Sequence, residues 1–330
     1  MQKLFGYLLI YLIGSTVFGQ NLTNFQFYQK NGKKVNVEKV AKELAKYDVV
    51  LFGEHHNDAV NHWLQLKITE KIYEQNKNIH LGMEMFERDN QTYLTNYVLN
   101  GLDEKQFKDS VRFWNNYKTD YQPLIEFAKK NKLAAIATNV PRKYASKVAK
   151  ESLKSLDDLS ADEKKWIVKL PLTVDYEAPG YPEMIEMMGE HSGMKAKQFV
   201  DAQALKDATM SESILRNLPK NGIFIHYNGD YHSKNYGGIY WYLKNTNPNL
   251  KVAVISILES DEDLKMTLQK KKNLYQQNSF WSYQKILQKH FKYKTAKISR
   301  FFLTILNIIF KKNTCPFFGC QLIFILCSLY

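Results

Sequence analysis

Short apolar runs recur along the chain, and each is followed directly by a polar residue. They cover residues 48–53, 79–86, 133–138, 222–227 and 251–258. Continuous apolar runs of this length are typical of strands that are buried on both faces. The pattern therefore predicts strands that belong to the interior of one sheet.

Helical periodicity separates these runs. After the first run, Trp63, Leu64, Ile68 and Ile72 recur at a spacing that would place them on one helix face, and Asp58 or Asn57 can cap that helix. Strands that alternate with helices form βαβ units. We predict an α/β fold with a mostly parallel central sheet and helices on both faces.

Residues 150–217 interrupt this alternation and are predicted to form a helical insertion. A loop rich in Pro and Tyr at 171–182 precedes a methionine-rich segment, and residues 196–218 have the pattern of a long amphipathic helix.

The first nineteen residues are predicted to be a signal peptide. Lys3 precedes an apolar run at 4–13, and small residues follow it. A membrane anchor is the alternative, but a spanning helix needs roughly 20 apolar residues. We therefore expect an exported protein of the periplasm, outer membrane or cell surface. No cysteine lies near residue 19 to carry a lipid.

The net charge of +13 comes almost entirely from residues 264–330. That segment holds twelve Lys or Arg residues and no Asp or Glu, which leaves about +1 for residues 1–263. Because residues 1–263 are nearly neutral, we expect no nucleic-acid partner.

Residues 264–330 are themselves basic and then apolar. This segment is either a helix at a membrane surface or not the natural end of the fold, so its role stays open.

The positions of the cysteines limit the chemistry of residues 1–314. Cys315, Cys320 and Cys327 are the three cysteines of the chain, and residues 1–314 contain none. Residues 20–263, which we take as the folded domain, therefore have neither disulfides nor thiolate metal sites.

Ionisable residues cluster directly after the first strand. Glu54, His55 and His56 follow the apolar run at 48–53. Ligands of parallel sheets bind beyond the carboxyl ends of the strands. A carboxylate beside two imidazoles can ligate a metal or accept a proton. The alternative is a polar turn that caps the next helix, but capping alone does not account for three ionisable groups.

Three other strand ends contribute candidates for the same pocket. Glu84 lies inside the second apolar run, where an ionised carboxylate needs a partner, and Arg88, Arg112 or Arg142 could pair with it. Arg142 follows the third run and could clamp a carboxylate. His232 follows the fourth run and is a further candidate for this pocket. His226, still within the apolar strand, is interpreted as structural.

These segments together resemble the ChaN family of haem-binding uptake proteins, in a superfamily with TraB and Tiki. The resemblance covers roughly residues 38–258 and depends on the order of the following segments: LFGEHHND, LGMEMFERD, FWNNYKTDYQPLIEFAKKNKLAAIATNVPRKYA, AKQFVDAQALKDATMSESI and IHYNGDYHSKNYGGIYWYL. The chain departs from the family in lacking a lipobox cysteine and in its 264–330 segment.

The resemblance implies a non-enzymatic, exported protein that binds haem for iron acquisition. In the family, a tyrosine takes the haem iron and two haems stack across a homodimer, so we expect a homodimer and an outer-membrane uptake system as partners. The insertion offers Tyr176 or Tyr181 as iron ligand. Met184 and Met188, beside Met187, would line the haem face, and His191 and Lys195 would meet the propionates. A plain packed helical cap is the alternative for this insertion.

Tiki-like relatives imply a different function, a metal-dependent hydrolase. Glu54, His55, Glu84 and His232 would then be the catalytic residues. His55, Glu84 and His232 would bind a divalent Mn, Co or Zn ion. A degenerate member that binds no ligand is the third possibility.

Overall fold

The computed structural model describes residues 25–188, 194–258 and 280–285. Its strands are β1 (Phe25–Gln29), β2 (Lys34–Val35), β3 (Val49–Glu54), β4 (Ile79–Glu87), β5 (Ala135–Asn139), β6 (Ile223–Gly229), β7 (Val252–Leu258) and β8 (Phe280–Lys285). Its α-helices are α2 (Val37–Leu44), α3 (Ala59–Gln75), α4 (Gln91–Leu99), α5 (Glu104–Ser110), α6 (Gln122–Asn131), α7 (Arg142–Glu151), α8 (Tyr181–Met187), α9 (Met194–Arg216) and α10 (Gly238–Thr246).

The strands form one sheet in the order β2-β1-β8-β7-β3-β6-β4-β5. The strands from β8 to β5 run parallel, and β1 pairs antiparallel with both β8 and β2. The predicted α/β class and mostly parallel sheet are thus confirmed. The structure adds β1, β2 and β8 at one edge, and β8 lies in the 264–330 segment, for which the sequence suggested no place in the sheet.

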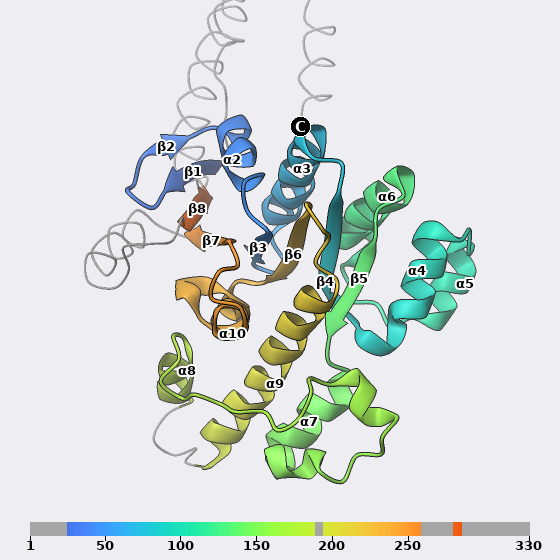
Figure 1. The fold of residues 1–330 in the computed structure, drawn as a ribbon, viewed down its shortest axis with the longest axis vertical. Helices are drawn as coiled ribbons and strands as arrows, with labels where there is room; N and C mark the ends of the chain where they lie inside the picture. The colour runs from blue at the N-terminus through green and yellow to red at the C-terminus, as the bar shows by residue number, and fades with distance from the viewer. Residues whose placement is uncertain (1–24, 189–193, 259–279, 286–330) are drawn as a thin grey trace, which may run out of the picture. The chain divides into compact units, whose positions relative to one another are not determined.

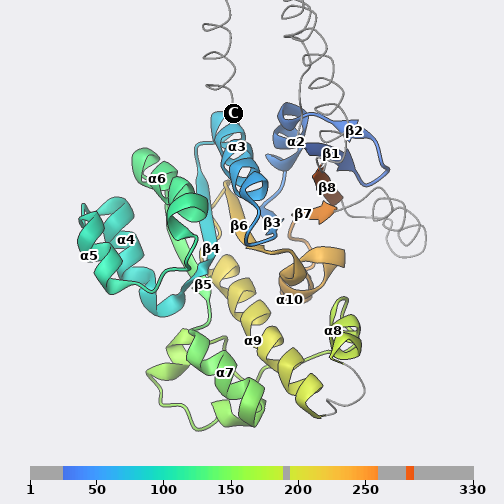
Figure 2. The same ribbon diagram turned by 180° about the vertical axis from the view of Figure 1, so that it is seen from behind.

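Helices cover both faces of the sheet (Figures 1 and 2). Alternate residues of a strand point to opposite faces. Val50 and Phe52 of β3 face the core that α2, α3, α4 and α6 cover. Val49 and Leu51 face a second core, which α9 and α10 cover. Burial on both faces explains why the central strands appear as continuous apolar runs in the sequence.

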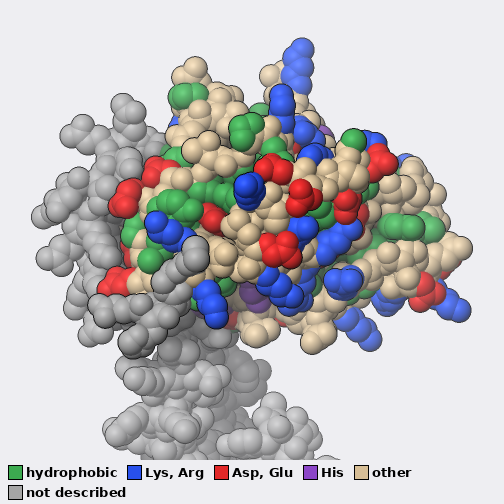
Figure 3. Space-filling view, turned by 90° about the horizontal axis from the view of Figure 1, so that it is seen from below, with side chains coloured by type: hydrophobic (Ala, Val, Ile, Leu, Met, Phe, Trp, Pro, Cys, Tyr) green, Lys and Arg blue, Asp and Glu red, His purple; other side chains and the backbone are tan. Residues whose placement is uncertain are grey.

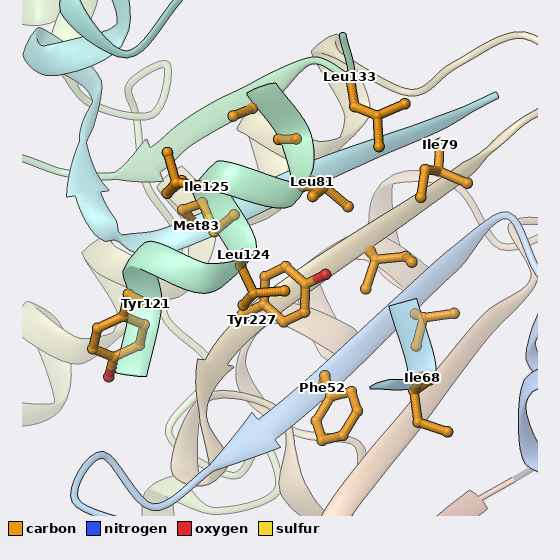
Figure 4. Close-up of a cluster of buried hydrophobic side chains, with 14 of the residues drawn as sticks. Phe52, Ile68, Ile79, Leu81, Met83, Tyr121, Leu124, Ile125, Leu133 and Tyr227 are labelled. Carbon is orange, nitrogen blue, oxygen red and sulfur yellow. The ribbon is translucent and has the colours of Figure 1, made fainter. Parts of the chain in front are cut away.

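The larger core packs α3 and α6 against the sheet, with Phe52, Ile68, Leu81 and Leu124 among its fully buried side chains (Figure 4). Asp58 caps α3, because its side chain accepts a hydrogen bond from the N–H of Val60 at 2.9 Å. The prediction for Trp63 was wrong: its side chain is 47% exposed. Adjacent helix positions differ by about 100° in direction, so Leu64 and Trp63 cannot both point into one narrow core.

The predicted insertion is partly helical. α8, α9 and short 3₁₀ turns are joined by extended stretches, and α7, α8 and the start of α9 lie beyond the sheet, at the bottom of Figure 1.

Charged side chains of both signs intermix on the face that Figure 3 shows. Within the described residues, no helix combines the length and apolar character that crossing a bilayer requires. The predicted signal peptide lies outside the described residues.

Candidate functional site

The carboxyl ends of β3 and β6 bring two of the predicted motifs together. The two strands pair in parallel, with Glu54 opposite Gly229, so the residues that follow each strand leave the sheet at the same edge. A cavity of about 490 Å³ opens there. It is lined by Glu54, His55, His56, Met184, Met187, Met188, Phe199, Gln203, Gly229, Asp230, Tyr231 and His232.

Glu54 is the fixed point at the end of β3. Its carboxylate is buried and accepts hydrogen bonds from the Tyr121 hydroxyl and the Gln65 side-chain amide, each at 2.6 Å. It also pairs with His56 Nδ1 at 2.8 Å. Burial lowers the pKa of His56, but this hydrogen bond and the charges of Glu84 and Glu54 outweigh burial and raise it. The hydrogen bond to Glu54 also holds the His56 ring in one orientation.

Gly229 lets two imidazoles approach the strand end. A side-chain carbon at this position would lie 2.9 Å from His56 Cε1 and 3.7 Å from His232 Cδ2. The first distance is too short for two carbon atoms in contact. A residue without Cβ is therefore required where the His56 ring crosses β6.

A buried chain of ionisable groups runs from β4 to the insertion. Glu84 accepts the Gly229 N–H at 2.6 Å and pairs with His232 Nε2 at 3.2 Å. His232 Nδ1 pairs with Asp207 of α9, and the Tyr181 hydroxyl of α8 donates to the same carboxylate at 2.8 Å. The side chains of this chain are all more than nine-tenths buried: Glu84, His232, Asp207 and Tyr181. Gly229 contributes its backbone N–H.

This chain holds a charged imidazole in the interior. Burial lowers the pKa of His232, but the two flanking carboxylates, Glu84 and Asp207, raise it to about 10. Burial also disfavours ionised Glu84, yet the charge and hydrogen bond of His232 hold the pKa of Glu84 well below its usual range. The pair is therefore an imidazolium and a carboxylate at neutral pH.

The arginine partners considered for Glu84 do not pair with it; His232 does. Arg88 turns away from the cavity and forms a 2.9 Å ion pair with Glu212 of α9. Arg142 is exposed at the start of α7 and is not among the cavity residues. The strand order explains this, since β5 is the edge strand and β4 separates it from β6.

The interpretation of His226 as structural is confirmed. Its side chain is fully buried, with Nε2 2.8 Å from the Thr138 hydroxyl and Nδ1 3.0 Å from the Asn228 amide oxygen. Burial lowers the pKa of His226 to about 4, so the ring is neutral at physiological pH.

The other wall of the cavity is apolar and comes from the insertion. Met184, Met187 and Met188 line it from α8 and its C-cap, and Phe199 lines it from α9. Met187 is 73% exposed and Phe199 is 44% exposed. Tyr231, also a lining residue, is half-exposed, and its ring lies 3.2 Å from the Lys234 Nζ atom, measured to the ring centroid. The cavity thus combines methionine and aromatic side chains with the ionisable residues at the carboxyl ends of β3 and β6.

The two tyrosines suggested as iron ligands lie behind this wall. Tyr181 is 2% exposed and donates to Asp207, while Tyr176 donates to Asp201 at 2.7 Å. Neither belongs to the lining set. Lys195 is exposed near the start of α9 and is not a lining residue either. His191 lies outside the described residues.

The alternative metal ligands do not form a ligand cluster. Among the described side chains, no group of three or more His, Cys, Asp or Glu is arranged to hold a metal ion. His232 pairs instead with Glu84 and Asp207.

The fold is similar to that of a solved structure. The solved structure of the haem-binding ChaN of Campylobacter jejuni is 17% identical, with a TM-score of 0.59, and the match covers 80% of this chain and 98% of that one. A MARTX toxin effector domain from Vibrio vulnificus is 15% identical, with a TM-score of 0.39, over 69% of this chain and 36% of that one. No curated protein sequence matches.

A family model described as haem-binding uptake, Tiki superfamily, ChaN matches residues 40–243, which is more than half of the chain. That span contains the strand ends of β3, β4 and β6, the methionine-bearing helix and Tyr231. The chain belongs to the ChaN family of haem-binding uptake proteins in the Tiki superfamily.

Proposed function

We propose that this protein binds haem in the cavity at the carboxyl ends of β3 and β6. The supporting observation is the apposition of an exposed phenol, Tyr231, and an apolar wall that bears three methionines. Cofactor pockets are concave, mostly apolar and about 300–1,000 Å³ in volume, and this cavity of about 490 Å³ has these properties. Tyrosine oxygen is an established axial ligand of haem iron.

In this proposal each group of lining residues has its own contact. The Tyr231 oxygen would face the iron, and Met184, Met188 and Phe199 would contact the porphyrin plane. His56, whose pKa is raised, would face the propionates at the polar rim. The haem is cargo, and its iron supplies the element to be acquired.

Tyr231 is preferred to the tyrosines of the insertion because of the hydrogen bonds that those tyrosines make. Burial and the carboxylate of Asp201 raise the pKa of Tyr176 to about 12, and burial and Asp207 raise that of Tyr181 well above its ordinary value. Coordination to ferric iron requires the phenolate. Forming it at Tyr176 or Tyr181 would place a second negative charge beside an aspartate.

Export, iron acquisition and assembly are further parts of the proposal. The apolar segment at 4–13 supports export, and the family description supports a role in uptake. Met187, Phe199 and Tyr231 leave apolar surface exposed around the cavity. A second copy would cover this surface in a homodimer, and an outer-membrane uptake system would receive the cargo or deliver it.

Replacing Tyr231 tests the iron ligand. Tyr231→Phe should weaken ferric haem binding at least tenfold and remove the phenolate-to-iron charge-transfer absorption, because only the ligating oxygen is lost. Tyr176→Phe is the matched control and should bind as the wild type does. Titration of the full chain with haem, followed by absorption spectroscopy, gives both readouts. An unchanged spectrum for Tyr231→Phe would assign the ligand elsewhere.

A further inference from the structure

We propose that a second cavity of this protein binds a ligand that carries phosphate groups. The cavity has a volume of about 670 Å³, and it shares no lining residue with the cavity at the carboxyl ends of β3 and β6. Residues from the segment 157–170 and the last residue of α9, Arg216, line it. Haem plays no part in this second site.

Positive charge is concentrated in this cavity. Its lining includes four cationic side chains, Lys164, Lys165, Lys169 and Arg216, and Asp157 is the one acidic lining residue. Four positive charges and one negative charge leave a net charge of +3. Residues 1–263 as a whole carry only about +1. A concave surface of one sign on a nearly neutral body attracts a ligand of the opposite sign, here an anion.

Two of the lysine ammonium groups have no carboxylate partner among the described residues. The Lys164 Nζ atom donates to the Asp157 carbonyl oxygen at 2.8 Å, and that acceptor is neutral. Lys169 donates only its backbone N–H, to Glu212 at 3.2 Å, and its ammonium group forms no ion pair with a described side chain. Both positive charges are therefore available to an anion in the cavity.

Arg216 is oriented by a carboxylate that it shares with another arginine. Its guanidinium donates to Glu212 Oε1 at 2.9 Å, and Glu212 Oε2 accepts from Arg88 at 2.9 Å. One carboxylate cannot neutralise two guanidinium groups. The Arg216 side chain is 57% exposed, so its other N–H groups can reach a ligand. The planar donor fork of arginine matches the oxygens of a phosphate group.

The remaining lining residues are apolar: Ile167, Val168 and Leu170. A ligand can therefore place a charged group among the cations and an apolar part against these side chains. The volume of about 670 Å³ lies within the range of about 300–1,000 Å³ that is usual for small-molecule sites. A phosphate monoester carries about −1.5 to −2 at neutral pH in one compact group, so it matches a net charge of +3 better than a single carboxylate does.

The experiment is a calorimetric titration of the full chain with inorganic pyrophosphate at low ionic strength. We expect saturable binding at one site. Lys164→Met/Lys169→Met should bind at least tenfold more weakly, because both unpaired ammonium groups are lost while methionine keeps the apolar stem. Lys105→Met/Lys118→Met removes the same charge at exposed positions that do not line the cavity, and it should bind as the wild type does.

Two further measurements identify the chemistry and the source of the ligand. A triglutamate peptide should bind at least tenfold more weakly than pyrophosphate. Sedimentation with phosphatidylglycerol vesicles but not with phosphatidylcholine vesicles, lost in Lys164→Met/Lys169→Met, would assign the cavity to a lipid headgroup. Pyrophosphate binding without vesicle binding would assign it to a free phosphate compound.

Three results would overturn the proposal. They are the absence of saturable binding to both pyrophosphate and the anionic vesicles, equal binding by the two double variants, and equal affinity for triglutamate and pyrophosphate. The haem affinity of Lys164→Met/Lys169→Met should change less than threefold, because neither lysine lines the cavity proposed for haem.

Discussion

His232→Ala is expected to lower the free energy of unfolding by about 3–5 kcal/mol at pH 7. The substitution removes the imidazolium between Glu84 and Asp207 and leaves two buried carboxylates without their shared partner. Removing one member of a buried ion pair typically costs this amount, because the remaining charge stays desolvated. Urea unfolding of the wild type and the variant measures the difference. Tyr231→Phe, at the exposed neighbouring position, should change stability by less than about 0.5 kcal/mol.

The same substitution should change how stability depends on pH. The pKa of His232 is raised to about 10 in the fold, above about 6.5 in the unfolded chain. Its contribution is therefore complete below about pH 6.5 and is lost as the pH rises through about 10. The difference between wild type and His232→Ala should shrink across that range. A difference below about 1 kcal/mol at pH 7, or one that does not vary from pH 6.5 to 10, would contradict the imidazolium assignment.

Arg88→Met should destabilise the fold by a similar amount, about 3–5 kcal/mol. The buried guanidinium donates to the Ser213 hydroxyl at 2.8 Å, to the carbonyls of Ile167 and Thr209 at 2.8 and 2.7 Å, and to Glu212 at 2.9 Å. Methionine keeps the apolar stem but removes all four of these hydrogen bonds. Since α9 carries Phe199 and Asp207, the loss should also loosen the wall of the cavity.

Arg142→Met is the matched control for Arg88. Arg142 also follows a parallel strand, but it is exposed, and surface substitutions usually change stability by less than about 0.5 kcal/mol. Urea midpoints and slopes of both variants, compared with the wild type, give the measurement. Equal midpoints for the two variants would show that the Arg88 network does not stabilise the attachment of α9.

The central strands were predictable because a strand buried on both faces appears in the sequence as a continuous apolar run. β4 was expected at 79–86 and spans Ile79–Glu87, and β7 was expected at 251–258 and spans Val252–Leu258. β1, with the sequence FQFYQ, and the two-residue β2 lack such a continuous run. Their pairing at the sheet edge depends on contacts distant in the chain.

The site was predictable only as far as the strand ends defined it. The cavity is lined by Glu54, which ends β3, and by His55, His56 and His232, which follow strands. Glu84 lies within β4 and pairs with His232. The exclusion of Arg142 follows from strand order, which the sequence does not encode locally.

Asp207 and Tyr231 were missed for different reasons. Asp207 lies within α9, where Gln203 and Ser211, one turn to either side, are polar and buried as well, so the helix pattern does not single it out. Tyr231 stands between Asp230 and His232, and only the three-dimensional fold shows that its phenol is exposed at the cavity while Tyr181 is buried. The tyrosine content of the insertion pointed to Tyr176 and Tyr181, whose hydroxyls donate to Asp201 and Asp207 in the fold.

The most direct test of the central claim is a haem titration that asks whether the cavity is the binding site. Met188→Glu places a carboxylate on the apolar wall, and Leu99→Glu makes the same kind of change at a comparably exposed position on α4. Absorption titrations of the full-length variants should show Soret-band binding lost or weakened at least tenfold for Met188→Glu and unchanged for Leu99→Glu. Wild-type haem affinity in Met188→Glu would contradict the assignment of haem to this cavity.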